Sequence, residues 1–264
     1  MKPVLISTVI ALAFCAFAPA RDATGGRIVV PARDGSPPRV VNCSTMNGAI
    51  TVKTHTGTDV IVEDGPSRSA GEAPGGMRRI GAPAGGLEVT EEEGAITVHK
   101  RPTGNGDLVI TVPAGTSLRL HTFSGAINVD GVHGEVDVHT LNGHVTMTGI
   151  SGTVTAYSQN GPIKVTMDRV DPGKPLAFSA FNGELDLTFP PDLKANLSVR
   201  SDRGAVYSDF EVTLGARAIA EKNGRSRGRS RARGGDTLRG TINGGGVDVT
   251  IRTFNGGVYI RKKK

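Results

Sequence analysis

The sequence predicts an all-β protein built from stacked short strands, and three observations support this fold class. Glycine accounts for 37 of the 264 residues, twice its usual share of about 7%. Tryptophan is absent and aromatic residues total only 4%, so the core must come from Val, Ile, Leu and small side chains. Apolar and polar residues alternate within short segments that follow glycine turns. This pattern is typical of many short strands rather than of a helical bundle.

The first 20 residues form a predicted secretory signal peptide. Lys2 gives a basic start, residues 4–18 are mostly apolar, and Ala18-Pro19-Ala20 is a small-x-small cleavage site. The apolar run is too short for a spanning helix, which needs about 20 such residues. We therefore expect an exported chain, located in the periplasm, on the cell surface or outside the cell. Residues 21–39 are expected to form a linker.

Residues 40–264 are expected to form one domain made of a strand repeat. Glycines recur at a stride of nine between Gly125 and Gly161, and the turns match best at eighteen. Each rung of the stack should therefore take roughly 18–21 residues. A β-sandwich also gives alternating strands and remains the alternative fold. Alternation directs these side chains inward: Ile127, Val129, Val136, Val138, Val145, Met147, Val154, Ile163 and Val165. It directs these outward: Asn128, Asp137, Thr146 and Lys164.

The turns predict equivalent corners on successive rungs. Gly125, Gly143 and Gly161 should stack there, with Asn142 and Asn160 forming a short ladder beside them. A large apolar residue stands two positions before most of these glycines, and we expect this column to fill the interior. Its members are Met46, Phe123, Leu141, Phe181 and Phe254.

Several of these segments resemble a bacterial "putative adhesin" β-strand-repeat family, a domain of unknown function. The similar copies include residues 124–132 (SGAINVDGV) and 142–150 (NGHVTMTGI), with a lead-in at 108–118 (LVITVPAGTSL). The closing segments are residues 204–210 (GAVYSDF), 238–246 (LRGTINGGG) and 252–256 (RTFNG). The resemblance covers roughly residues 40–264. It implies a right-handed parallel β-solenoid and an adhesin-like module, and it brings no catalytic residue.

Two insertions interrupt the repeat, at about residues 63–86 and 217–239. The second contains eight basic and two acidic residues, a net +6 that equals the formal charge of the whole chain. It is expected to be either a solvated insertion or a polyanion-binding segment. An exported chain would meet anionic polysaccharide, cell-wall polymer or a membrane surface rather than nucleic acid. The candidate binding residues are Arg225, Arg227, Arg229, Arg231 and Arg233.

No residue pattern predicts a catalytic, cofactor or metal site. His121, His139 and Tyr157 should stack on adjacent rungs, but Asp137 is expected to be too far from His139 to share an ion with it. Cleavage leaves Cys43 as the one thiol, which we interpret as a buried small residue. The alternative function is a carbohydrate-active β-helix enzyme. It would need charged side chains clustered in one groove.

Overall fold

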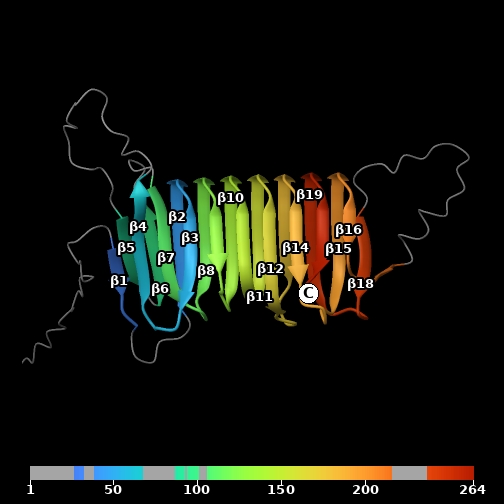
Figure 1. The fold of residues 1–264 in the computed structure, drawn as a ribbon, viewed down its shortest axis with the longest axis horizontal. Helices are drawn as coiled ribbons and strands as arrows, with labels where there is room; N and C mark the ends of the chain where they lie inside the picture. Colours follow the sequence, from blue (N-terminus) through green and yellow to red (C-terminus); the bar gives the residue numbers. More distant parts are fainter. Residues whose placement is uncertain (1–26, 33–38, 68–86, 93, 101–105, 216–236) are drawn as a thin grey trace, which may run out of the picture.

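The computed structural model describes residues 27–32, 39–67, 87–92, 94–100, 106–215 and 237–264, which form 20 strands and no helix. The strands lie side by side in two sheets that face each other along the length of the molecule (Figure 1). We call them sheet A and sheet B. In spatial order, sheet A contains β1 (Arg27–Val30), β4 (Val60–Ser67), β7 (Gly106–Pro113), β3 (Ile50–His55), β9 (Ile127–Asp130), part of β11 (Val145–Asn160), β12 (Ile163–Val170), β14 (Leu185–Phe189), β20 (Val258–Lys262) and β16 (Val206–Ser208).

Sheet B has the matching arrangement. Its spatial order is β5 (Leu87–Glu92), β6 (Ala95–Lys100), β2 (Val40–Asn47), β8 (Ser117–Ser124), β10 (Glu135–Asn142), part of β11, β13 (Leu176–Asn182), β19 (Val247–Asn255), β15 (Ala195–Arg203), β18 (Thr237–Ile242) and β17 (Val212–Leu214). β11 is long enough to cross from one sheet to the other. Its residues 145–152 pair in sheet A and its residues 153–160 pair in sheet B.

A rung consists of one strand in sheet B, a corner, and one strand in sheet A. Neighbouring rungs are parallel, because each strand pairs with its equivalent in the next rung. The register joins Asn142 and Asn160, which are 18 residues apart, and then Asn160 and Asn182, which are 22 apart. These parallel rungs make the architecture solenoid-like rather than an antiparallel sandwich.

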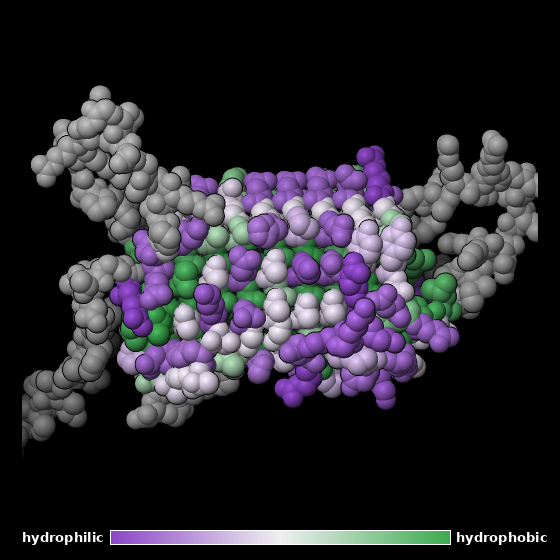
Figure 2. Space-filling view, viewed as in Figure 1, coloured by the Kyte–Doolittle hydropathy of each residue, from purple (hydrophilic) through white to green (hydrophobic). Residues whose placement is uncertain are grey.

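The core lies between the two sheets, and it confirms the predicted alternation. All nine side chains predicted to point inward are at most 2% exposed. Of the four predicted to point outward, Lys164 is exposed and Asn128, Asp137 and Thr146 are half-buried. Phe178 of β13 and Phe189 of β14 meet edge to face across the interior, with ring centroids 6.2 Å apart. On the face seen in Figure 2, polar side chains form rows along the long axis.

The corners confirm the predicted glycine stack and asparagine ladder. The Gly125 N–H donates to the Asn142 carbonyl, and the Gly143 N–H donates to the Asn160 carbonyl. A Cβ at Gly143 would overlap the carbonyl oxygen of Gly125, so only glycine allows the rungs to approach this closely. Asn160 Nδ2 donates to Asn142 Oδ1 at 3.0 Å, and Asn182 extends the ladder with an equal bond to Asn160.

The rungs do not follow the order of the chain at either end. The β2–β3 rung lies between β6–β7 and β8–β9. The last rung of the chain, β19–β20, lies between β13–β14 and β15–β16. Antiparallel strands then extend the sheets at the ends. At one end β4 and β1 extend sheet A and β5 extends sheet B; at the other end β18 and β17 extend sheet B.

The segments outside the predicted repeat are only partly described. Residues 27–30 of the predicted linker form strand β1, and residues 63–67 of the first predicted insertion belong to β4. The second predicted insertion meets β18, which begins at Thr237. The predicted signal peptide lies outside the described residues.

Candidate functional site

The outer face of sheet B carries aligned rows of side chains, and one of them is a row of rings. The register places His121, His139 and Tyr157 next to one another on β8, β10 and β11. Their ring centroids are 6.1 Å apart for the histidine pair and 5.8 Å apart for His139 and Tyr157. The same row continues to Ser44 on β2 and His99 on β6, and we call all of these positions the ring row.

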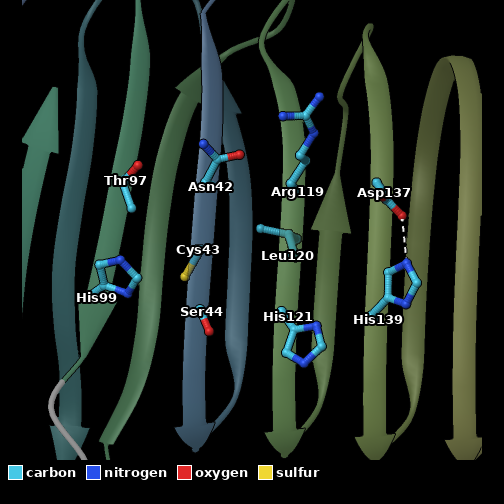
Figure 3. A pocket seen from close by; sticks show the side chains of 10 residues that line it. All are labelled: Asn42, Cys43, Ser44, Thr97, His99, Arg119, Leu120, His121, Asp137 and His139. Atoms are coloured by element: carbon cyan, nitrogen blue, oxygen red, sulfur yellow. Dashed lines mark ion pairs between the residues drawn. The ribbon is translucent and has the colours of Figure 1, made fainter. Parts of the chain in front are cut away.

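The ring row contains a hollow over β2. Ser44 is short and lies between His99 and His121, so the surface sinks between the two imidazoles (Figure 3). The hollow has a volume of about 230 Å³. Asn42 lies beside it, and its Oδ1 is buried without a hydrogen-bond partner among the described residues.

The structure shows that the prediction for Asp137 is wrong. Its Oδ1 lies 3.1 Å from His139 Nε2, as the dashed line in Figure 3 marks. The strand rise separates the two backbones, but both side chains lean along the strand and close the gap. Asp137 Oδ1 is also buried and accepts no well-oriented hydrogen bond. The contact becomes an ion pair when the imidazole is protonated.

The described residues give little support for a metal site or for a reactive thiol. No three His, Cys, Asp or Glu side chains gather there closely enough to hold a metal ion. Cys43 is 2% exposed and packs in the core. Burial raises the pKa of its thiol to about 12, so the sulfur is protonated at neutral pH and is a poor nucleophile.

The column of large apolar residues lies outside the core, so its predicted interior position is wrong. Met46, Phe123 and Phe181 are 52%, 46% and 46% exposed, and the other two members are half-buried. The interior position beside the corner is taken instead by a small residue one place earlier, such as Thr122, which is fully buried. We call the outward column the apolar row; its members are Met46, Phe123, Leu141, Phe181 and Phe254.

Alternation from a neighbouring core residue locates the apolar row. Leu120 points inward, His121 outward and Thr122 inward, so Phe123 must point outward. The large size of these side chains suggested burial, but the pleat decides their direction. The alternation of inward and outward residues, followed from Leu120 to the corner, therefore predicts from the sequence that the apolar row faces outward.

The arginines predicted to bind polyanions lie outside the described residues. Arg225, Arg227, Arg229, Arg231 and Arg233 all fall within residues 216–236.

The sequence also matches one family model, over residues 39–260. The chain belongs to the Toastrack DUF4097 family. The match spans the whole two-sheet stack except the first strand and the last residues of β20. It confirms the family resemblance read from the repeat, and it brings no assigned activity with it.

One solved structure is similar to this Toastrack chain. It is described as a "putative cell adhesion protein" from Clostridium sporogenes, with 10% sequence identity and a TM-score of 0.44. The alignment covers 90% of this chain and 99% of the other. No curated protein gives a significant match. Within the described residues there is no helix of the length and hydrophobicity needed to cross a bilayer.

Proposed function

We propose that this chain is an exported, non-catalytic binding module of the cell envelope, with an adhesin-like role. The apolar row carries this proposal. Five of six successive positions along the outer face of sheet B hold Met, Phe or Leu, and three of these side chains are about half exposed. Exposed apolar side chains that are contiguous over several strands mark interaction surfaces more often than isolated ones do.

The described chemistry supports binding better than catalysis. Glycoside hydrolysis needs two carboxyl groups that flank one bond. On the outer face of sheet B, Asp137 contacts His139, Glu135 pairs with Lys174, Asp202 pairs with Arg200, and Asp248 accepts a hydrogen bond from Asn196. Each of these carboxylates thus belongs to a separate contact. The alternative, a carbohydrate-active enzyme, predicts products released from a polysaccharide, which the experiment below detects.

The predicted signal peptide supports the exported location. Cleavage after Ala20 would give a mature chain that begins at Arg21. N-terminal sequencing of the protein recovered from cell fractions tests this. A cytoplasmic chain that retains Met1 would contradict the proposal.

The finer geometry of the stack is also a proposal. Parallel strands joined through a crossover are right-handed in about 98% of cases, which supports a right-handed coil. A crystal structure of the mature chain would test the handedness and the rung length together.

Retention on isolated envelope polymers tests the binding function. The mature chain should be retained by at least one of peptidoglycan, capsular polysaccharide or lipid vesicles, with no sugar product released during incubation. A variant in which Met46, Phe123 and Phe181 are serine should be retained more weakly. Loss of retention without loss of the folded circular dichroism signal is the expected result. Equal retention of the variant, or steady release of product, would overturn the proposal.

A further inference from the structure

A second and larger hollow on the outer face of sheet B lies over β13. Ser179 occupies the ring row there, between Tyr157 on β11 and Arg252 on β19. Their backbones are two strand spacings apart, about 9.6 Å, and the short serine leaves the space between them open. The hollow has a volume of about 450 Å³, enough for one or more rings of a ligand.

One wall of this hollow is apolar and flat. Phe181 and Phe254 stack in the adjacent apolar row with ring centroids 4.9 Å apart and planes within 3° of parallel. Arg203 lies over Phe254, 5.1 Å from its centroid. Among the described residues no further ring stacks on Phe181, which is 46% exposed. A flat aromatic wall at one side of a polar hollow suits the C–H face of a sugar ring.

The charge of the hollow is positive and only partly neutralised. Three arginines line it, Arg200, Arg239 and Arg252, against one carboxylate, Asp202. Arg200 uses its Nε and Nη2 to bind Asp202 Oδ1 at 3.3 and 3.1 Å. Arg252 and Arg239 form no ion pair or hydrogen bond through their side chains with any described residue. Arg200 and Arg252 are also direct neighbours in the register, and like charges in that position repel. An anion placed between them would relieve the repulsion.

We propose that this hollow binds an acidic sugar unit of a polysaccharide. We call it the Ser179 hollow and define it by Tyr157, Ser179, Phe181, Arg200, Arg252 and Phe254. The acidic group of the sugar is held by the fork of Arg252, which matches a carboxylate with two parallel hydrogen bonds. The sugar ring packs against Phe181. The inference rests on the proposed binding function and names its ligand and its site.

The ring row gives the polymer a direction. From the Ser179 hollow it runs over Tyr157, His139 and His121 to the hollow at Ser44, four strand spacings away, or about 19 Å. A linear polysaccharide that lies along the long axis reaches both hollows. Two weak subsites on one chain raise the overall affinity through their effective concentration.

The test measures binding of the mature chain, residues 21–264, to polygalacturonate by isothermal titration calorimetry. Arg252→Gln removes the free charge and Phe181→Ala removes the apolar wall, and each should weaken binding at least about tenfold. Tyr207→Ala removes an exposed ring from β16 in sheet A, outside the apolar row and both hollows, and should change affinity less than about twofold. Thermal melts of all variants confirm that they fold.

Two further polymers separate the chemistry of the site from charge alone. Neutral dextran should not bind. Dextran sulfate that binds as tightly as polygalacturonate, with no effect of Phe181→Ala on either polymer, would show attraction by charge only and overturn the inference.

A third variant separates this inference from the proposed function. It replaces Arg225, Arg227, Arg229, Arg231 and Arg233 with glutamine, and it should keep most of the affinity for polygalacturonate. If it alone loses binding, the binding function stands and the Ser179 hollow is not the site. If the wild type is retained by an envelope polymer but ignores polygalacturonate, the ligand class is wrong. If the wild type is retained by no envelope polymer, the proposed function itself fails.

Discussion

At the scale of single residues, the inner side of the asparagine–glycine corner is lined by small hydroxyl side chains. Thr122, Thr140 and Thr253 are all less than 4% exposed. Thr253 Oγ1 donates to the Gly183 carbonyl at 3.2 Å, whereas the hydroxyls of Thr122 and Thr140 have no partner among the described residues. The threonine hydroxyl at this position is thus hydrogen-bonded in one rung and without a partner among the described residues in two others.

This difference predicts opposite effects of one substitution. Thr140→Val keeps the shape and removes an unpaired buried hydroxyl, so it should raise the free energy of unfolding by about 1 kcal/mol. Thr253→Val removes a hydrogen bond and should lower it by a similar amount. Urea denaturation of both variants checks the pair. Equal destabilisation would mean that Thr140 has a partner, such as buried water.

The buried thiol of Cys43 predicts a loss of stability at alkaline pH. Burial raises its pKa from the ordinary 9.0 to about 12 in the folded chain. Between those values the unfolded chain binds fewer protons than the folded one, so stability falls as pH rises. The slope from this group is at most about 1.4 kcal/mol per pH unit. Below pH 8 the thiol is protonated in both states and contributes no slope.

Cys43→Ala lacks this titration and is the matched control. The difference in unfolding free energy between the wild type and Cys43→Ala should stay constant from pH 6 to pH 8 and shrink from pH 9 to pH 11. A constant difference across the whole range would show that the thiol ionises as easily in the folded chain as in the unfolded one.

At the scale of elements, alternation and glycine corners were predictable because both are local. The pleat fixes which of two neighbours faces the core, as for Val136 and Asp137, and close contact between rungs requires glycine at position 143. The prediction for Phe123 is wrong because it rests on the size of the side chain, whereas the alternation along the strand directs this residue outward. The hollows could not be foreseen, since each depends on which strand becomes the neighbour of a serine.

At the end of the stack nearest the N-terminus, Lys100 and Asp64 form an ion pair whose lysine is buried. Lys100, the last residue of β6, occupies the inner corner position next to Thr45, and its side chain is 2% exposed. It pairs with Asp64 of β4, which lies between β1 and β7 at one end of sheet A. The pair therefore joins sheet A to sheet B across this end of the stack.

Breaking this pair should destabilise the chain strongly. Asp64→Ala leaves a buried ammonium without a carboxylate and should lower the unfolding free energy by roughly 3–5 kcal/mol. Glu63, next to Asp64 on β4, forms an exposed pair with Arg27 of β1, and Glu63→Ala should cost less than about 1 kcal/mol. Chemical denaturation of both variants makes the comparison. If Asp64→Ala together with Lys100→Met is no more stable than Asp64→Ala alone, the unpaired charge is not the cause.

At the scale of the whole molecule, the order of the rungs is not encoded in the repeat pattern. Every copy has the same alternation and the same corner, so each can stack on any other. The local pattern gives no reason for β19–β20 to lie inside β15–β16, or for β2–β3 to lie inside β6–β7. The antiparallel strands at the ends provide one. β18 pairs with β15 and β4 pairs with β7, so the rungs that contain β15 and β7 lie next to these end strands.

This order predicts that the C-terminal rung is essential to the stack. In a solenoid with rungs in chain order, removing the last rung shortens the stack and leaves the rest folded. Here, a stop after Gly246 removes β19 and β20, the common neighbours of β13–β14 and β15–β16. The strands on both sides would present unpaired edges to water and to other chains. We expect aggregation, or a loss of the cooperative melt, and rapid proteolysis from β13 onward. A stop after Lys262 leaves every strand in place and is the control. A chain ending at Gly246 that melts like the wild type would contradict the rung order described here.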